Sequence, residues 1–165
     1  QVASSNNKTF KRRMESQAVR DSLLHLAGRL DLTLGGPVID PAKSESSPRR
    51  SLYFAQTAND EHRFLAVFDN SNVLECYRRN ESVMPQQALA LTNSQLSRDS
   101  AAALAASLSA LKPRPFIREA FLTVLGRQPT RDERQTAREG LAALSHDRAL
   151  FLHALLNHND FVTLR

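Results

Sequence analysis

The chain has a single cysteine among its 165 residues, and it contains no Cys-x-x-Cys-His segment and no pair of closely spaced cysteines. One thiol excludes a disulfide within the chain, and the missing pairs exclude covalent haem attachment and the common cysteine-built zinc sites. We therefore expect no cofactor in this domain, neither haem nor a bound metal ion.

Long apolar runs and nucleotide-binding motifs are missing as well. No run approaches the roughly 18 apolar residues that indicate a membrane span, so we expect none. The sequence has no glycine-rich phosphate loop and no Gly-x-Ser-x-Gly nucleophile motif. Because no motif identifies a reaction, we favour a domain that is not by itself an enzyme.

Acidic residues are fewer than basic ones, 17 against 22, which gives a net charge of +5, and 18 of the basic residues are arginine. Guanidinium forks suit carboxylates or phosphates, either within the protein or on a partner. The doublets Arg12-Arg13, Arg49-Arg50 and Arg78-Arg79 could form a stripe for nucleic acid. Acidic residues are interleaved with them and stacking aromatics are few, so we do not expect nucleic-acid binding.

Hydrophobic residues make up 41% of the chain, which is enough for a core. We predict one mostly α-helical domain over residues 1–165, an array of about five or six helices with at most a short strand near Ser51–Ala55. Polar composition predicts flexible chain at 1–10 and at 38–50, the latter being a loop with two prolines and several serines.

Helical spacing of apolar residues places helices at 11–30, 85–93, 95–111 and 116–125, with a short one after Asn59 or Asp60. Pro85 suits a first helical position. Pro113 and Pro115 are expected to end the helix at 95–111. Thr130 and Glu133 form a capping-box pattern for a helix to about residue 144. Ser145 or Asp147 should begin the last helix.

One helical row in the first helix, Asp21, His25 and Arg29, has two interpretations. It is either a solvent-exposed charge ladder or an acid and base pair lining a cleft. Near the last helix, His146, His153 and His158 do not have the spacing of a metal site, and we interpret them as surface or interhelical histidines.

The stretch from Cys76 to Asn93 holds the most unusual residues. Arg78 and Arg79 could lower the pKa of the Cys76 thiol and favour a nucleophilic thiolate. The alternative is a buried structural thiol, because unpaired cysteines are among the most buried residues and no histidine lies near in the sequence.

Several short motifs follow one another along the chain. They are Ala18-Val19-Arg20-Asp21-Ser22-Leu23-Leu24, Gly28-Arg29-Leu30-Asp31, Gly35-Gly36-Pro37, Arg49-Arg50-Ser51-Leu52-Tyr53, Phe68-Asp69, Cys76 with Arg78-Arg79, Pro85-Gln86-Gln87-Ala88-Leu89, Asn93, Leu125-Gly126-Arg127-Gln128-Pro129 with Glu133, and Leu155-Leu156-Asn157 before Phe161. In this order the motifs resemble a known family, the C-terminal domain of unknown function in exported cytochrome-c-type proteins of planctomycetes.

The resemblance implies an excised C-terminal piece of an exported, periplasmic or cell-envelope protein, with haem held only by another domain. It implies other domains of that chain as partners, together with a polysaccharide or another exported protein, and it supplies no catalytic residue. The first hypothesis is a structural or interaction module linked to polysaccharide handling. The alternative is a ligand-binding or catalytic domain for acidic or sulfated glycans, with candidate residues Arg20, Asp21, Arg49, Arg50, Tyr53, Asp69, Cys76, Arg78, Arg79 and Gln87.

Overall fold

The computed structural model describes residues 12–43, 45–55 and 84–164, and within these ranges the fold is mostly α-helical. Six α-helices are present in the described part: α1 (Ser16–Leu26), α3 (Met84–Asn93), α4 (Gln95–Ser107), α5 (Pro113–Leu125), α6 (Arg131–Ala143) and α7 (Arg148–Leu156). This confirms the predicted array of five or six helices. The short helix expected after Asn59 or Asp60 lies outside the described residues.

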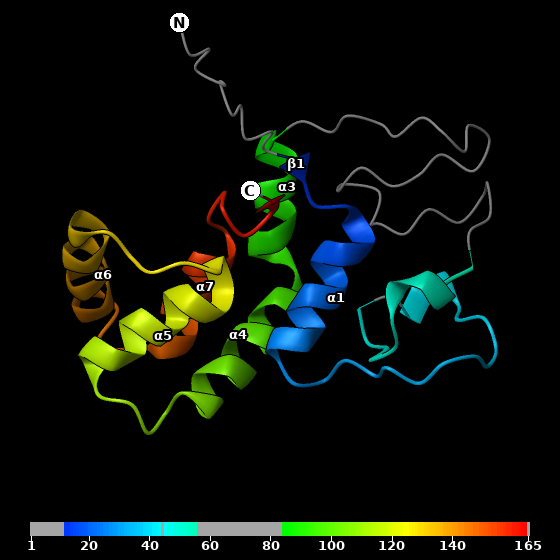
Figure 1. Ribbon diagram of the computed structural model, residues 1–165. Helices are drawn as coiled ribbons and strands as arrows, with labels where there is room; N and C mark the ends of the chain where they lie inside the picture. The colour runs from blue at the N-terminus through cyan, green and yellow to red at the C-terminus, as the bar shows by residue number, and fades with distance from the viewer. Residues whose placement is uncertain (1–11, 44, 56–83, 165) are drawn as a thin grey trace, which may run out of the picture.

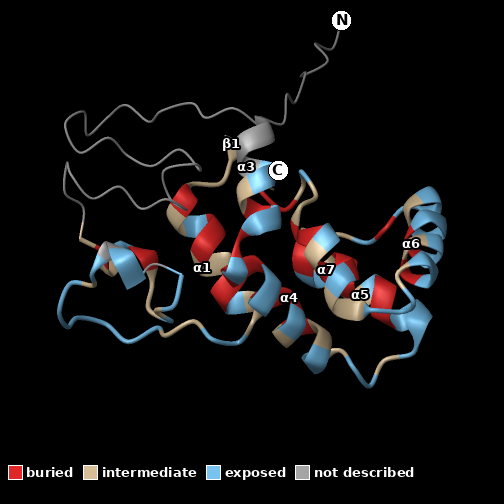
Figure 2. Ribbon diagram, turned by 180° about the vertical axis from the view of Figure 1, so that it is seen from behind, coloured by how far each residue is buried: buried red, intermediate tan, exposed pale blue. Residues whose placement is uncertain are grey.

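Helix α4 lies in the middle of the array, between α1 on one side and α5, α6 and α7 on the other (Figure 1). It packs most extensively against α7 and also contacts α1 and α3. Figure 2 shows the buried residues on the faces that these helices turn toward one another. The fully buried side chains at these contacts include Leu23, Leu96, Phe116, Leu152 and Leu156.

Helix α1 is shorter than the predicted span of 11–30 and leads into an irregular segment, residues 27–55, that returns to its side. Gly28 stops the helix in a left-handed conformation, φ 66°, which a glycine adopts without the cost that a Cβ would impose. The segment carries two short 3-10 turns, η1 (Pro41–Lys43) and η2 (Ser51–Tyr53). The expected strand near Ser51–Ala55 is therefore a 3-10 turn followed by one bridge, between Ile39 and Phe54.

The α4–α5 connection differs from the sequence prediction. Helix α4 ends at Ser107, several residues before Pro113, and Pro113 is the first residue of α5 instead of the end of α4. A proline is favoured at a first helical position because its missing N–H would have no helical partner there. The same argument that located the start of α3 near Pro85 applies here, so the prediction that Pro113 and Pro115 end a helix was wrong.

Local capping residues fix the last two helices as predicted. Thr130 accepts a hydrogen bond from the N–H of Glu133, and the Glu133 carboxylate accepts one from the N–H of Thr130, which completes the capping box of α6. Asp147 caps α7 by accepting from the N–H groups of Ala149 and Leu150. Each arrangement satisfies backbone donors that a helix start otherwise leaves unpaired.

Two ends of the described chain meet in a short antiparallel pair, β1 (Arg12–Arg13) with β2 (Thr163–Leu164). The N–H of Met14 extends this pairing with a hydrogen bond to the carbonyl of Val162, 2.8 Å away. Phe161 and Val162 are buried beside it, so the turn after α7 closes over the core and fixes the start of α1 against α7. None of the described helices is long and apolar enough to cross a membrane.

Candidate functional site

Arg20 on α1 is the largest fully buried side chain among the described residues, with none of its surface exposed. Its guanidinium donates hydrogen bonds to the carbonyls of Ser47 (2.5 Å) and Arg49 (2.9 Å) and to the Ser51 hydroxyl (3.2 Å). The same group lies over the Phe54 ring, 4.7 Å from its centroid. One side chain from α1 thus holds four points of the 27–55 segment.

Asp21 completes this arrangement from the next position of α1. Its Oδ1 accepts from both the backbone N–H (2.8 Å) and the hydroxyl (2.6 Å) of Ser51, and it lies 3.6 Å from the Arg20 guanidinium. Burial lowers the pKa of Arg20 to about 10, and the Asp21 charge opposes that shift. Arg20 therefore remains charged at neutral pH, with protein acceptors around it.

Arg49 and Tyr53 form a second contact that holds the segment from within. The Arg49 guanidinium lies 4.1 Å from the centre of the Tyr53 ring and donates to the carbonyls of Gly35 and Pro37. The Tyr53 hydroxyl accepts from the N–H of Gly35 at 3.0 Å. Gly36 lies so close that a Cβ there would be 3.3 Å from an Arg49 nitrogen, which gives the Gly35-Gly36-Pro37 motif a packing reason.

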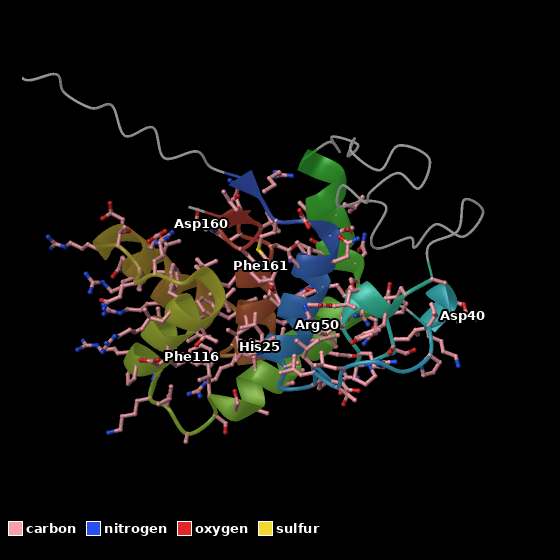
Figure 3. The ribbon with its side chains drawn as sticks, turned by 45° about the vertical axis from the view of Figure 1, so that its right-hand side comes forward. His25, Asp40, Arg50, Phe116, Asp160 and Phe161 are labelled. Atoms are coloured by element: carbon pink, nitrogen blue, oxygen red, sulfur yellow. The ribbon has the colours of Figure 1, made fainter. Side chains whose placement is uncertain are left out.

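A groove lies between α1, α5, the closing turn and part of the 27–55 segment, and it has a volume of about 540 Å³. Its apolar wall includes Met14, Leu26, Leu30, Val124 and Phe161. Its polar rim includes Asp21, Ser22, His25 and Arg50. We call this feature the α1 groove; Figure 3 labels His25 and Arg50 where α1 approaches the 27–55 segment.

The rim bears directly on the two interpretations of the Asp21, His25 and Arg29 row. Asp21 and His25 both line the α1 groove, whereas Arg29 does not. Arg50 approaches Asp21 Oδ2 with its Nε, 3.9 Å away, at the outer limit of an ion pair. The acid and the base therefore share a concave surface, but one oxygen of the acid is already bonded to Ser51.

A third polar cluster joins α5, α6 and the turn after α7. Arg127 binds the two oxygens of Glu133, at 2.8 and 2.6 Å, and its guanidinium also contacts the Asp160 carboxylate at 2.7 Å. The hydrogen bonds from Arg127 lower the pKa of Glu133 to about 2, and those from Glu133 and then Asp160 raise the pKa of Arg127. Sequence reasoning did not place these residues in a site, although Arg127 and Glu133 belong to its quoted motifs.

The predicted site residues are brought together only in part. Arg20, Asp21, Arg49 and Tyr53 converge on the 27–55 segment, and Arg50 reaches the groove rim. Asp69, Cys76, Arg78 and Arg79 lie outside the described residues, and of Gln87 only the backbone, in α3, is described. In the described ranges no three metal-ligating side chains form a cluster that could hold an ion.

Comparison with known proteins identifies the family. A model of PSD1, a protein of unknown function (DUF1553), matches residues 5–141, which is most of the chain. The chain belongs to the PSD1 family. No curated protein and no solved structure gives a significant match.

The PSD1 match covers both arginine clusters held inside the fold, the one at Arg20 and Arg49 and the one at Arg127 and Glu133. In the described residues, the motifs that contain Arg20, Arg49 and Arg127 thus coincide with side chains that bind backbone or carboxylates within this chain. Helix α7, which supplies part of the core, lies beyond the matched residues of the PSD1 chain.

Proposed function

We propose that this PSD1 domain is a non-catalytic structural and interaction module of a larger exported protein. The observation that supports this proposal is that candidate ligand residues are already bonded within the fold. Arg20 is fully buried and bonded to three acceptors of the 27–55 segment, and Asp21 is bonded twice to Ser51. A substrate anion would have to displace these contacts, each of them a hydrogen bond to a charged group.

The order of the sequence motifs supports the wider setting of the proposal: a cell-envelope protein with a haem-binding domain elsewhere in its chain and a role in polysaccharide handling. In this setting the PSD1 domain supplies a rigid helical body and needs no cofactor of its own. Its partners would be the other domains of that chain, a polysaccharide or a second exported protein.

The decisive experiment distinguishes the negative charge of Asp21 from its hydrogen bonds to Ser51. Asp21→Asn keeps an oxygen that can accept from Ser51, whereas Asp21→Ala removes both bonds and leaves two donors unpaired. A structural role predicts a small loss of thermal stability for Asp21→Asn and a clearly larger one for Asp21→Ala, by about 1–3 kcal/mol. Ser22→Ala, on the same helix, is the matched control and should change the midpoint little.

A panel of acidic and sulfated sugars at millimolar concentration completes the test. The proposal predicts no rise in the thermal midpoint of the wild-type chain and no turnover of these sugars. If Asp21→Asn retained its stability but abolished a sugar-dependent shift or a turnover, Asp21 would be a functional carboxylate and the proposal would fail.

The α1 groove favours one second candidate function, the binding of a small ligand. Asp21 and His25 line its rim beside Arg50, above an apolar wall. The contrasting prediction is specific: His25→Ala, at an exposed position, would abolish ligand-induced stabilisation without lowering the stability of the free protein. A structural module predicts that His25→Ala leaves both quantities unchanged.

A further inference from the structure

Among the arginines that the structure describes, two groups differ in what their guanidinium groups contact. One group binds within the fold: Arg20, Arg49, Arg127 and Arg148 reach backbone carbonyls or carboxylates of other elements. The other group includes three exposed residues of α6, Arg131, Arg134 and Arg138. In the part of the chain that the structure describes, the guanidinium groups of these three have no hydrogen-bond or ion-pair partner.

The three residues follow one side of α6 at steps of three and four positions, and we call them the arginine row. An α-helix rises about 1.5 Å per residue, so successive members lie roughly 4.5 and 6 Å apart along the axis. The row surrounds a hollow of about 450 Å³, which among the described residues is lined by Asp132, Gln135 and the three arginines. Blue-tipped side chains point outward along the α5 and α6 side of the molecule in Figure 3.

The chemistry around the row restricts the partner. The large hydrophobic side chains that are exposed in the described ranges all lie outside α5 and α6, so this surface offers nothing to insert into a lipid bilayer. The aromatic residues of α5, Phe116 and Phe121, are buried, so no ring is available to stack on nucleic-acid bases.

Interleaved carboxylates restrict the partner further. Asp132 lies among the arginines, and the Gln135 amide donates to Glu139 at 2.6 Å, which leaves a second acid on the same helix. These two charges weaken the attraction of a uniformly anionic polymer. A protein segment can instead place acidic residues opposite the arginines and a basic residue opposite Asp132. Arginine forks also bind carboxylates through two parallel bonds.

We propose that the arginine row of α6 is a docking surface for an acidic helical segment of a protein partner. A second helix has the same rise per residue as α6, so carboxylates at steps of three and four positions on its face can meet each arginine in turn. This inference rests on the proposed function. It assigns the interaction module a binding surface, the arginine row, and a class of partner, an acidic helix.

Labelled peptides provide the test. An alanine-based helical peptide with glutamates at steps of three and four positions on one face is compared with a peptide of the same composition whose glutamates lie all around the helix. Fluorescence anisotropy should show at least about threefold tighter binding of the patterned peptide, and weakening of both as salt rises from about 50 to 200 mM.

The variants then assign the binding to the row. The triple change Arg131→Gln, Arg134→Gln and Arg138→Gln should weaken the patterned peptide about tenfold, and circular dichroism should stay unchanged because all three side chains are exposed. Arg134→Gln alone should weaken it about threefold. Arg29→Gln is the control matched in charge to Arg134→Gln, since Arg29 is exposed beyond α1 and its side chain has no partner in the described ranges.

Three results would overturn the inference. Equal affinity for the two peptides would mean that the row does not recognise the spacing of the glutamates. Equal weakening by Arg29→Gln and Arg134→Gln would mean that binding depends only on net charge. A sulfated polysaccharide or a single-stranded oligonucleotide that binds more tightly than the patterned peptide, and is weakened as much by the triple change, would assign the row to a different polymer. None of these variants touches Arg20 or Asp21, so the proposed function can stand or fail independently.

Discussion

At the scale of single residues, four arginines of the described chain act as internal connectors: Arg20, Arg49, Arg127 and Arg148. Arg20 links α1 to residues 47, 49 and 51, and Arg148 at the start of α7 donates to the carbonyls of Leu108, Ser109 and Leu111 at 2.6 to 2.8 Å. A guanidinium suits this task because it offers five donors in one plane and stays charged when buried. Arginine enrichment alone therefore does not indicate an anionic ligand.

The Glu133 carboxylate predicts a pH dependence of stability. Its pKa is lowered to about 2 from an ordinary value of 4.5, because Arg127 and the N–H of Thr130 bind the charged form. A lowered pKa gives stability that is fully present above pH 4.5 and is lost as the pH falls toward 2. The thermal midpoint should therefore drop progressively across this window.

Glu133→Gln is the matched variant for this measurement. The glutamine oxygen can still accept from the N–H of Thr130, so the capping box is kept while the charge is removed. We expect a lower midpoint at pH 7 and a shallower decline between pH 5 and 2, while the contact between Arg127 and Asp160 remains. An identical pH profile for wild type and variant would show that Glu133 does not contribute.

At the scale of elements, the C-terminus of α6 has an unusual sequence for its conformation. Ser145 and His146 both have positive φ, 53° and 63°. The N–H of Ser145 bonds to the carbonyl of Ala142 and that of His146 to Leu141, which is the Schellman pattern of helix ends. Glycine is the usual residue at the first of these positions, because a Cβ there is strained.

Ser145→Gly should therefore stabilise the protein. Removing the Cβ relieves the left-handed conformation, and we expect the free energy of unfolding to rise by roughly 0.5–1 kcal/mol. Urea denaturation measures this change directly. The opposite control is Gly126→Ala at the end of α5, where φ is 66° and nothing lies within 4 Å of an added Cβ. That change should cost about 1 kcal/mol from the backbone conformation alone, and a stabilising Gly126→Ala would contradict the argument.

At the scale of the whole molecule, the described fold has two parts that are held in different ways. Helices α1 and α3 to α7 share an apolar core that includes Leu24, Leu104 and Phe151. The 27–55 segment contributes only Phe54 to the buried hydrophobic residues and is joined to α1 through Arg20 and Asp21. Polar contacts thus hold the segment to α1, whereas apolar burial holds most of the array.

This division predicts two kinds of destabilised variant. Arg20→Met should release the 27–55 segment and leave the helical array folded, because a methionine cannot donate the hydrogen bonds that Arg20 makes to Ser47, Arg49 and Ser51. Hydrogen exchange should then show weaker protection at the amides of Asp31, Ile39 and Ala55, which are hydrogen-bonded within the segment, while those of α4 and α7 stay protected.

Arg148→Met is the comparison, since Arg148 connects α7 to the end of α4 within the array. It should lower the global free energy of unfolding by about 2 kcal/mol and reduce protection in the helices as well as in the segment. A reduction of helix protection in Arg20→Met as large as that in Arg148→Met would show that the two parts unfold together.

Local sequence signals predicted most of the helices, because the residues that decide them are neighbours along the chain. Thr130 with Glu133 set the start of α6, and Asp147 set that of α7. The same kind of reasoning failed at Pro113, where a proline that can follow one helix can equally begin the next. The spacing of Asp21, His25 and Arg29 left open a charge ladder or a cleft, and only the structure shows that Asp21 and His25 line one groove.

The sequence by itself determined the helical class, the caps and the family, since all of these depend on residue identity and short spacing. Only the tertiary structure decided the partners of the candidate residues. Arg20 meets groups 27 to 31 positions away, and Arg127 meets Asp160, 33 positions away. No spacing rule connects such residues, because the chain between them is irregular or spans several helices. Whether an arginine binds within the fold or remains available to a partner is therefore fixed by how the helices pack.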